Sequence, residues 1–192
     1  MLKVLLIRTG ATEYDSQGRV QGTLDVPLSE DGRQQVEMVA EELSDHSIDA
    51  LYAGPCRATK QSADLLAQQL QLKAKTVDDL SNLNHGLWQG MLIEDVKSKQ
   101  PKVYRQWQEH PENVCPPEGE SLQMVRERLQ QALTKIAKKQ KSGVIAIVVP
   151  EPVTSVMRNV LRDDDLGDLW HADCNQLPSW ELIEMPAKVG NP

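Results

Sequence analysis

A chain of 192 residues with 40% hydrophobic residues is long enough to bury a core without disulfides or a structural metal, and it fits one domain better than two. The net charge of -7 excludes a broad basic surface for nucleic acid, and the basic run between Lys135 and Lys141 is typical of a solvated helix end. The three cysteines are too few and too widely spaced for a disulfide framework or a zinc site, which favours a reducing compartment.

Strand-like and helix-like segments alternate along the chain. The first are an apolar strand from Leu2 to Ile7 and an amphipathic helix from Ser29 to Leu43. The later expected elements are a strand at 50–53, a helix at 57–70, helical residues 94–109 interrupted at Pro101, a helix at 121–139, a strand at 144–149, a helix at 153–161 and a strand at 180–185. This order predicts an α/β fold of three layers, doubly wound around a mostly parallel sheet with 144–149 at its centre.

We expect residues 1–186 to form the single domain and residues 187–192 to form a loose tail. No apolar segment is long enough for a signal peptide or a membrane span, so the expected location is the cytoplasm, with no membrane and no nucleic acid as partners. The oligomeric state is left open by the sequence.

Ligands of doubly wound sheets bind beyond the carboxyl ends of the strands. The segments expected to converge there are 8–12, 54–57 and 150–151. They would bring two arginines, Arg8 and Arg57, to one place, which indicates a site for an anion.

Five segments, in order and at similar spacing, resemble the histidine phosphatase superfamily, the phosphoglycerate-mutase-like proteins. They are Arg8-Thr9-Gly10 with Gly18-Arg19, Gln21-Gly22, Pro27-Leu28-Ser29 and Gly32; Arg57-Ala58 with Gln61-Ser62-Ala63; Gly86-Leu87-Trp88-Gln89-Gly90; Pro117-Glu118-Gly119-Glu120-Ser121; and the strand that ends at Pro150. The resemblance covers about residues 2 to 185. It implies a phosphoglycerate-mutase-like fold, a phosphate pocket with Arg8, Gly10, Arg19 and Arg57, and neither a metal nor a cofactor. Arg19 could instead only fix a turn.

The resemblance also implies three catalytic groups that this chain fills differently. Thr9 stands where the family has the histidine that takes the phosphoryl group. Asn82 stands where the family has the acid that protonates the leaving group, and Glu151 stands where it has the second histidine. A threonine hydroxyl needs an adjacent base to act as a nucleophile, and an amide has no proton to give a leaving group. Loss of a general acid alone costs about 10² to 10⁴ in rate.

Glu151 would affect binding as well as chemistry. A carboxylate about 4 Å from a bound phosphate would repel each unit of its charge by roughly 4 kcal/mol. We expect Glu151 to accept hydrogen bonds from Arg8 or Arg57 and to occupy the phosphate site as a built-in anion.

These substitutions lead to the hypothesis that the chain has lost catalysis and binds an unknown small molecule or protein in a regulatory role. The alternative is a phosphomonoester phosphatase or mutase with residual or altered activity, in which Glu151 activates Thr9 while Arg8 and Arg57 hold the substrate. A third interpretation is a structural subunit. His85 is interpreted as structural, and the tryptophans as filling between layers.

Overall fold

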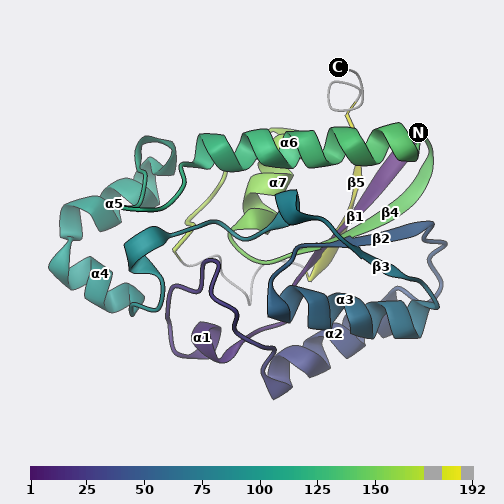
Figure 1. Cartoon of the computed structure of the whole chain (residues 1–192), viewed down its shortest axis with the longest axis horizontal. Coiled ribbons are helices and arrows are strands. Elements are labelled where there is room, and N and C mark those ends of the chain that lie inside the picture. Colours follow the sequence, from purple (N-terminus) through teal and green to yellow (C-terminus); the bar gives the residue numbers. More distant parts are fainter. Residues whose placement is uncertain (171–178, 187–192) are drawn as a thin grey trace.

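The computed structural model describes residues 1–170 and 179–186. This part contains a five-stranded sheet in the order β3-β2-β4-β1-β5 (Figure 1). The strands are β1 (Leu2–Arg8), β2 (Ala50–Ala53), β3 (Ala74–Thr76), β4 (Gly143–Val149) and β5 (Trp180–Glu184). All neighbours are parallel except β5, which runs antiparallel to β1. The predicted α/β fold is confirmed, with β4 at the centre of the sheet.

Helices cover both faces of the sheet, because alternate side chains of each central strand point to opposite faces. Leu5 and Ile7 of β1 pack against α2 (Glu30–Glu42) and α3 (Arg57–Leu70). Val4 and Leu6 face the larger core, which includes α6 (Leu122–Lys139) and α7 (Val153–Arg162). Figure 1 shows α6 and α7 above the strands and α2 and α3 below them. Burial on both faces explains why the central strands are almost wholly apolar.

The helix limits follow local capping signals. The hydroxyl of Ser29 accepts a hydrogen bond from the backbone of Gly32, and Ser121 does the same for Met124, so that each serine precedes its helix. Pro101 divides the predicted segment 94–109 into α4 (Ile93–Lys99) and α5 (Pro101–Glu109). Proline is acceptable there as the first residue of a helix, where its missing N–H is not needed.

Several short elements were not predicted from the sequence: α1 (Glu13–Ser16), β3 and the 3-10 helices η1 (Asp78–Leu80), η2 (Gly86–Trp88) and η3 (Pro111–Asn113). The helix α1 is a single turn that depends on a capping box between Thr12 and Asp15. The strand β3 has only three residues, lies at the sheet edge and has no apolar alternation that would identify it. The predicted tail at 187–192 lies outside the described residues. None of the helices in the described part has the length and apolar character that crossing a bilayer requires.

Candidate active site

A cavity of about 280 Å³ opens beyond the carboxyl ends of β1 and β4. Its lining includes residues 8–12 at the end of β1 and residues 150–152 after β4. It also includes the loop 18–22, His85, Ile93, Leu169 and Trp170. Its position is the one expected for a ligand site in a doubly wound sheet.

Pairing of β1 with β4 positions the residues that follow β1. The backbone N–H of Thr9 donates to the carbonyl of Val149 at 3.0 Å, which continues the parallel ladder past the end of β1. The side chain of Thr9 shares a hydrogen bond of 3.0 Å with the hydroxyl of Thr59 on α3. The backbone N–H of Gly10 donates to Ser62 at 3.2 Å. Two segments far from it in sequence, β4 and α3, therefore hold the turn after Arg8.

Gly10 is required by a close approach of two backbones. A Cβ atom at this position would lie 2.3 Å from the carbonyl oxygen of Gly32 in α2, which is closer than non-bonded atoms approach. The glycine lets α2 pack directly against the turn. The tight packing keeps Arg8 and Thr9 at the cavity.

Glu151 lines the same cavity at the beginning of the segment that leads into α7. Its Oε2 accepts hydrogen bonds from the backbone N–H and the hydroxyl of Ser155, at 3.3 and 3.0 Å. Its Oε1 is fully buried and has no hydrogen-bond partner among residues 1–170 and 179–186. Burial raises the pKa of Glu151, and the bonds from Ser155 and the charges of Arg8 and Arg158 only partly oppose this shift.

The predicted ion pair between Glu151 and an arginine of the site is absent from the described part of the chain. The carboxylate is instead turned to Ser155, the third residue of α7, because the backbone and hydroxyl there offer two donors. Burial also favours the uncharged carboxyl, which weakens the repulsion of a phosphate that an ionised Glu151 would exert. The cavity is left open rather than filled by an internal anion.

Of the two arginines predicted to converge, the structure brings Arg8 to the cavity and leaves Arg57 outside it. Arg57 is the first residue of α3 and its side chain is exposed. Its backbone N–H donates to Asp25 at 3.1 Å, and the next residue, Ala58, is fully buried. The strand end at residue 53 is placed as expected, but Arg57 is exposed and is not part of the cavity lining.

Arg19 is the second arginine of the cavity. It donates from Nη1 to the carbonyl of Gly90 at 2.7 Å and from Nε to Gln17 at 2.9 Å. Asp15 also lines the cavity, and its carboxylate accepts hydrogen bonds from the backbone and hydroxyl of Thr12 at 2.6 and 2.8 Å. Arg19 therefore lines the cavity and also braces the turn through its contacts with Gln17 and Gly90.

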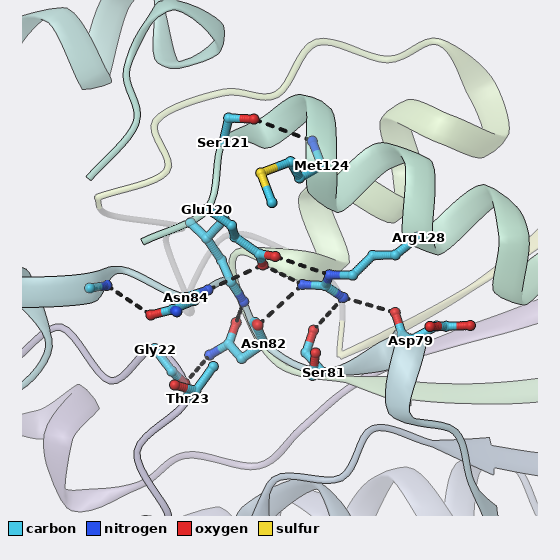
Figure 2. A network of polar contacts seen from close by, with 12 residues as sticks. Gly22, Thr23, Asp79, Ser81, Asn82, Asn84, Glu120, Ser121, Met124 and Arg128 are labelled. Atoms are coloured by element: carbon cyan, nitrogen blue, oxygen red, sulfur yellow. Dashed lines mark hydrogen bonds and ion pairs between the residues drawn. The ribbon is translucent and has the colours of Figure 1, made fainter. Parts of the chain in front are cut away.

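Asn82 is fully buried beside the cavity rather than in its lining. Its side-chain amide donates to the carbonyl of Gly22 at 2.9 Å, and its Oδ1 accepts from the backbone of Leu83 at 2.8 Å. Gly22 itself lines the cavity. Figure 2 shows the amide of Asn82 directed at Gly22, so this side chain positions a wall of the site.

A network around Arg128 of α6 holds the loop that carries Asn82 (Figure 2). The guanidinium donates to the carbonyls of Asp79 and Ser81 at 2.8 Å and to that of Asn82 at 3.1 Å. It also forms an ion pair of 2.7 Å with Glu120. This role of Arg128 could not be predicted from the sequence, because an arginine within an amphipathic helix has no signal that distinguishes it from a solvated one.

His85 lies at the cavity although the sequence analysis interpreted it as structural. It is 4% exposed and packs edge-to-face on Trp107, with ring centroids 5.6 Å apart. Burial lowers the pKa of His85 to about 4, so the imidazole is uncharged at neutral pH. Trp88, Trp107 and Trp170 are buried in the same cluster, as predicted for residues that fill the space between layers, whereas Trp180 is half-buried on β5.

Curated relatives include phosphatases and mutase-like proteins. The chain is 33% identical over 185 residues to phosphoserine phosphatase 1 of Hydrogenobacter thermophilus, an alignment that covers 96% of this chain and 87% of that protein. It is 30% identical over 149 residues to phosphoglycerate mutase-like protein 4 of Arabidopsis thaliana, covering 76% of this chain and 65% of that protein.

Solved structures share the fold. YhfR of Bacillus stearothermophilus superposes with a TM-score of 0.86 at 21% identity, over 97% of this chain and 93% of that one. The alpha-ribazole phosphatase of Shigella flexneri superposes with a TM-score of 0.81 at 23% identity, over 97% and 92%. These likenesses support the phosphoglycerate-mutase-like architecture.

The hypothesis that the chain has lost catalysis is contradicted by these findings. The relative at 33% identity is named a phosphatase, and the alternative stated from the sequence, a phosphomonoester phosphatase, fits it better. The physical argument for lost catalysis assumed a charged Glu151 that fills the pocket, and the structure has an open cavity with a carboxyl whose pKa is raised. The model of the histidine phosphatase superfamily, branch 1, matches residues 4–188. The chain therefore belongs to the histidine phosphatase superfamily.

Proposed function

We propose that this protein hydrolyses phosphomonoesters in the cavity beyond β1 and β4, with Glu151 as the group that moves a proton. The observation that carries the proposal is a buried carboxyl with a raised pKa in a cavity that Arg8 and Arg19 also line. Guanidinium groups bind phosphate oxygens through charge-assisted hydrogen bonds. A carboxyl with a pKa closer to neutrality is suited to proton transfer.

In the proposed reaction, Thr9 and Glu151 stand at the places of the two histidines that the family resemblance implies. The oxygen of a water molecule bonds to phosphorus while one of its protons passes to the carboxylate of Glu151. The ester P–O bond breaks and its electron pair remains on the alcohol oxygen, which takes the proton of the phosphate monoanion. Glu151 then returns its proton to the solvent. The products are the free alcohol and inorganic phosphate.

Direct attack by water is favoured here over a covalent intermediate on Thr9. A phosphothreonine would be an alkyl phosphate like the substrate. Its formation would replace one stable ester by another, and hydrolysis of an alkyl phosphate would still have to follow. The Thr9 hydroxyl is hydrogen-bonded to Thr59, and in this scheme it orients the phosphate. Asn82 has no proton to give, which is consistent with an alcohol that is protonated by the phosphate itself.

The proposal is tested by phosphate release from a panel of esters that includes 4-nitrophenyl phosphate and O-phosphoserine, the latter because of the name of the relative at 33% identity. We expect turnover by the wild-type protein that is lost in Arg8→Ala and retained in Arg33→Ala, an exposed arginine of α2. No turnover between pH 4 and 9 by a correctly folded protein would contradict the proposal. A phosphorylated threonine at position 9, found by mass spectrometry after rapid quenching, would contradict the direct route.

A further inference from the structure

Part of the cavity lining that the structure describes consists of uncharged side chains. These residues, called here the apolar wall, are Val20, His85, Ile93, Leu169 and Trp170. Four of these five residues are at most 6% exposed, and all of them except His85 belong to the larger hydrophobic core or pack against it. The lining also includes Arg8 and Glu151 at the strand ends. The cavity thus combines an arginine that can bind an anion with apolar residues.

Trp170 is held in place by a stack of aromatic rings. It lies nearly parallel to Tyr104, with centroids 5.2 Å apart and an interplanar angle of 11°. Its indole N–H donates to the carbonyl of Tyr104 at 3.0 Å, and its ring contacts that of Trp88 at 5.3 Å. A wall fixed in this way loses little conformational entropy when a ligand packs against it.

None of the five side chains of the apolar wall carries a charge that would pair with a charged group on the organic half of a substrate. His85 is uncharged at neutral pH because burial lowers its pKa to about 4. Asp15 and Arg19 also line the cavity, where Asp15 accepts two hydrogen bonds from Thr12 and Arg19 donates to Gly90 and Gln17. An ammonium group placed against the side chains of Ile93 and Leu169 would lose its hydration without a partner.

We propose that the alcohol half of the substrate is apolar and carries a flat ring that packs against Trp170 and Ile93 while its phosphate binds beside Arg8. This inference names the substrate class and rests on the proposed function. The cavity of about 280 Å³ is close to the lower limit for small-molecule sites, so the alcohol is small. Burying one ring of this size is worth about 10- to 100-fold in the preference for the substrate.

The test compares 2-phenylethyl phosphate with ethyl phosphate and phosphoethanolamine. The first two release similar primary alkoxides, so their kcat/KM ratio reports contact with the ring and not the leaving group. We expect a ratio of about 10 to 100 in favour of 2-phenylethyl phosphate, and phosphoethanolamine as the slowest of the three. Trp170→Ser and, as a milder change should that variant fail to fold, Ile93→Ser are expected to lower the ratio at least threefold. Leu87→Ser, at a leucine that is 59% exposed, is the control and should leave the ratio unchanged.

Binding of the matching phosphonates, measured by calorimetry, separates this inference from the proposed function. Tighter binding of 2-phenylethylphosphonate than of ethylphosphonate, lost in Ile93→Ser, supports the inference even if no ester is hydrolysed. Turnover of all three esters at equal kcat/KM overturns the inference and leaves the phosphatase proposal standing. Failure of both phosphonates to bind also overturns the inference.

Discussion

Glu151 shows how the environment of one side chain changes the chemistry that its identity implies. A carboxylate next to a phosphate site is repulsive when ionised, and the sequence analysis treated it as ionised. Burial of Oε1 raises the pKa of Glu151, and the nearby positive charges only partly reverse this effect. A group that would repel phosphate when ionised becomes one that holds its proton to a higher pH than an ordinary glutamate does.

The role of Glu151 predicts a specific pH dependence. In wild type, kcat should rise with pH as Glu151 ionises, with a midpoint above the ordinary glutamate pKa of 4.5. Glu151→Gln keeps the shape of the side chain but has no carboxyl that titrates. In this variant kcat should fall by about 10² to 10⁴, and the rise of kcat with pH should vanish. The pH profile of phosphate release measures both. Glu127→Gln, at an exposed residue of α6, is the matched control, and an unchanged profile in Glu151→Gln would refute the assignment.

The two arginines predicted from the sequence are expected to differ in effect. Arg8→Ala removes charge-assisted hydrogen bonds of about 1.5 to 3 kcal/mol, so kcat/KM should fall by at least tenfold. Arg57→Ala should change kcat/KM by less than about twofold, because Arg57 is exposed and outside the cavity lining. Inhibition by inorganic phosphate gives a second measurement. Equal losses in the two variants would show that both arginines contact substrate.

At the scale of elements, α6 does more than cover the sheet. Its Arg128 donates hydrogen bonds to three backbone carbonyls of the loop 79–82 and forms an ion pair with Glu120. The side chain of Asn82 in this loop donates in turn to the carbonyl of Gly22. One helix thus fixes a loop far from it in sequence and, through that loop, one side of the cavity (Figure 2). The shape of the site depends on this chain of contacts.

Two basic residues of α6 that both contact Asp79 allow a matched comparison. The side chain of Arg128 is 16% exposed, and Arg128→Ala leaves Glu120 and three carbonyls without their donor, so the free energy of unfolding should fall by about 3 kcal/mol. The ammonium of Lys135 pairs with the Asp79 carboxylate at 2.8 Å, but its side chain is 65% exposed, and Lys135→Ala should cost about 0 to 1 kcal/mol. Denaturant unfolding measures both. Similar losses would mean that the network around Arg128 does not stabilise the fold.

At the scale of the whole molecule, the buried His85 couples protonation to folding. Its pKa is lowered to about 4 in the folded state, from 6.5. Between these values the unfolded chain binds a proton that the folded protein does not, so stability decreases as pH falls from 6.5 towards 4. The raised pKa of Glu151 acts in the opposite sense, because the folded protein then holds a proton that the unfolded chain releases as pH rises above 4.5.

The contribution of His85 can be isolated with His85→Phe, which keeps a flat ring and removes the titration. Wild type should lose about 3 kcal/mol more stability than His85→Phe between pH 6.5 and 4. Because both proteins contain Glu151, its opposite contribution cancels in the difference. Urea unfolding at several pH values measures the two slopes, and parallel slopes would show that His85 is solvated in the folded protein.

Local signals were sufficient for most elements and for the place of the cavity. The apolar run before Arg8, the caps at Ser29 and Ser121, and Pro101 act within a few residues of chain, so the strands and helices that they specify could be predicted from the sequence. The parallel order of strands then placed residues 8–12 and 150–152 at one edge of the sheet. The edge strand β3 and the one-turn helix α1 were missed because elements so short carry too few residues to show a period.

The sequence alone therefore determined the fold class, the two central strands whose ends form the site, and Arg8, Thr9, Gly10, Arg19 and Glu151 as residues near it. Only the tertiary structure decided that Arg57 faces solvent, that Asn82 holds Gly22, and that His85 reaches the cavity. It also decided the raised pKa of Glu151. The direction of a side chain and its exposure to water depend on packing between segments distant along the chain, and no local pattern records that packing.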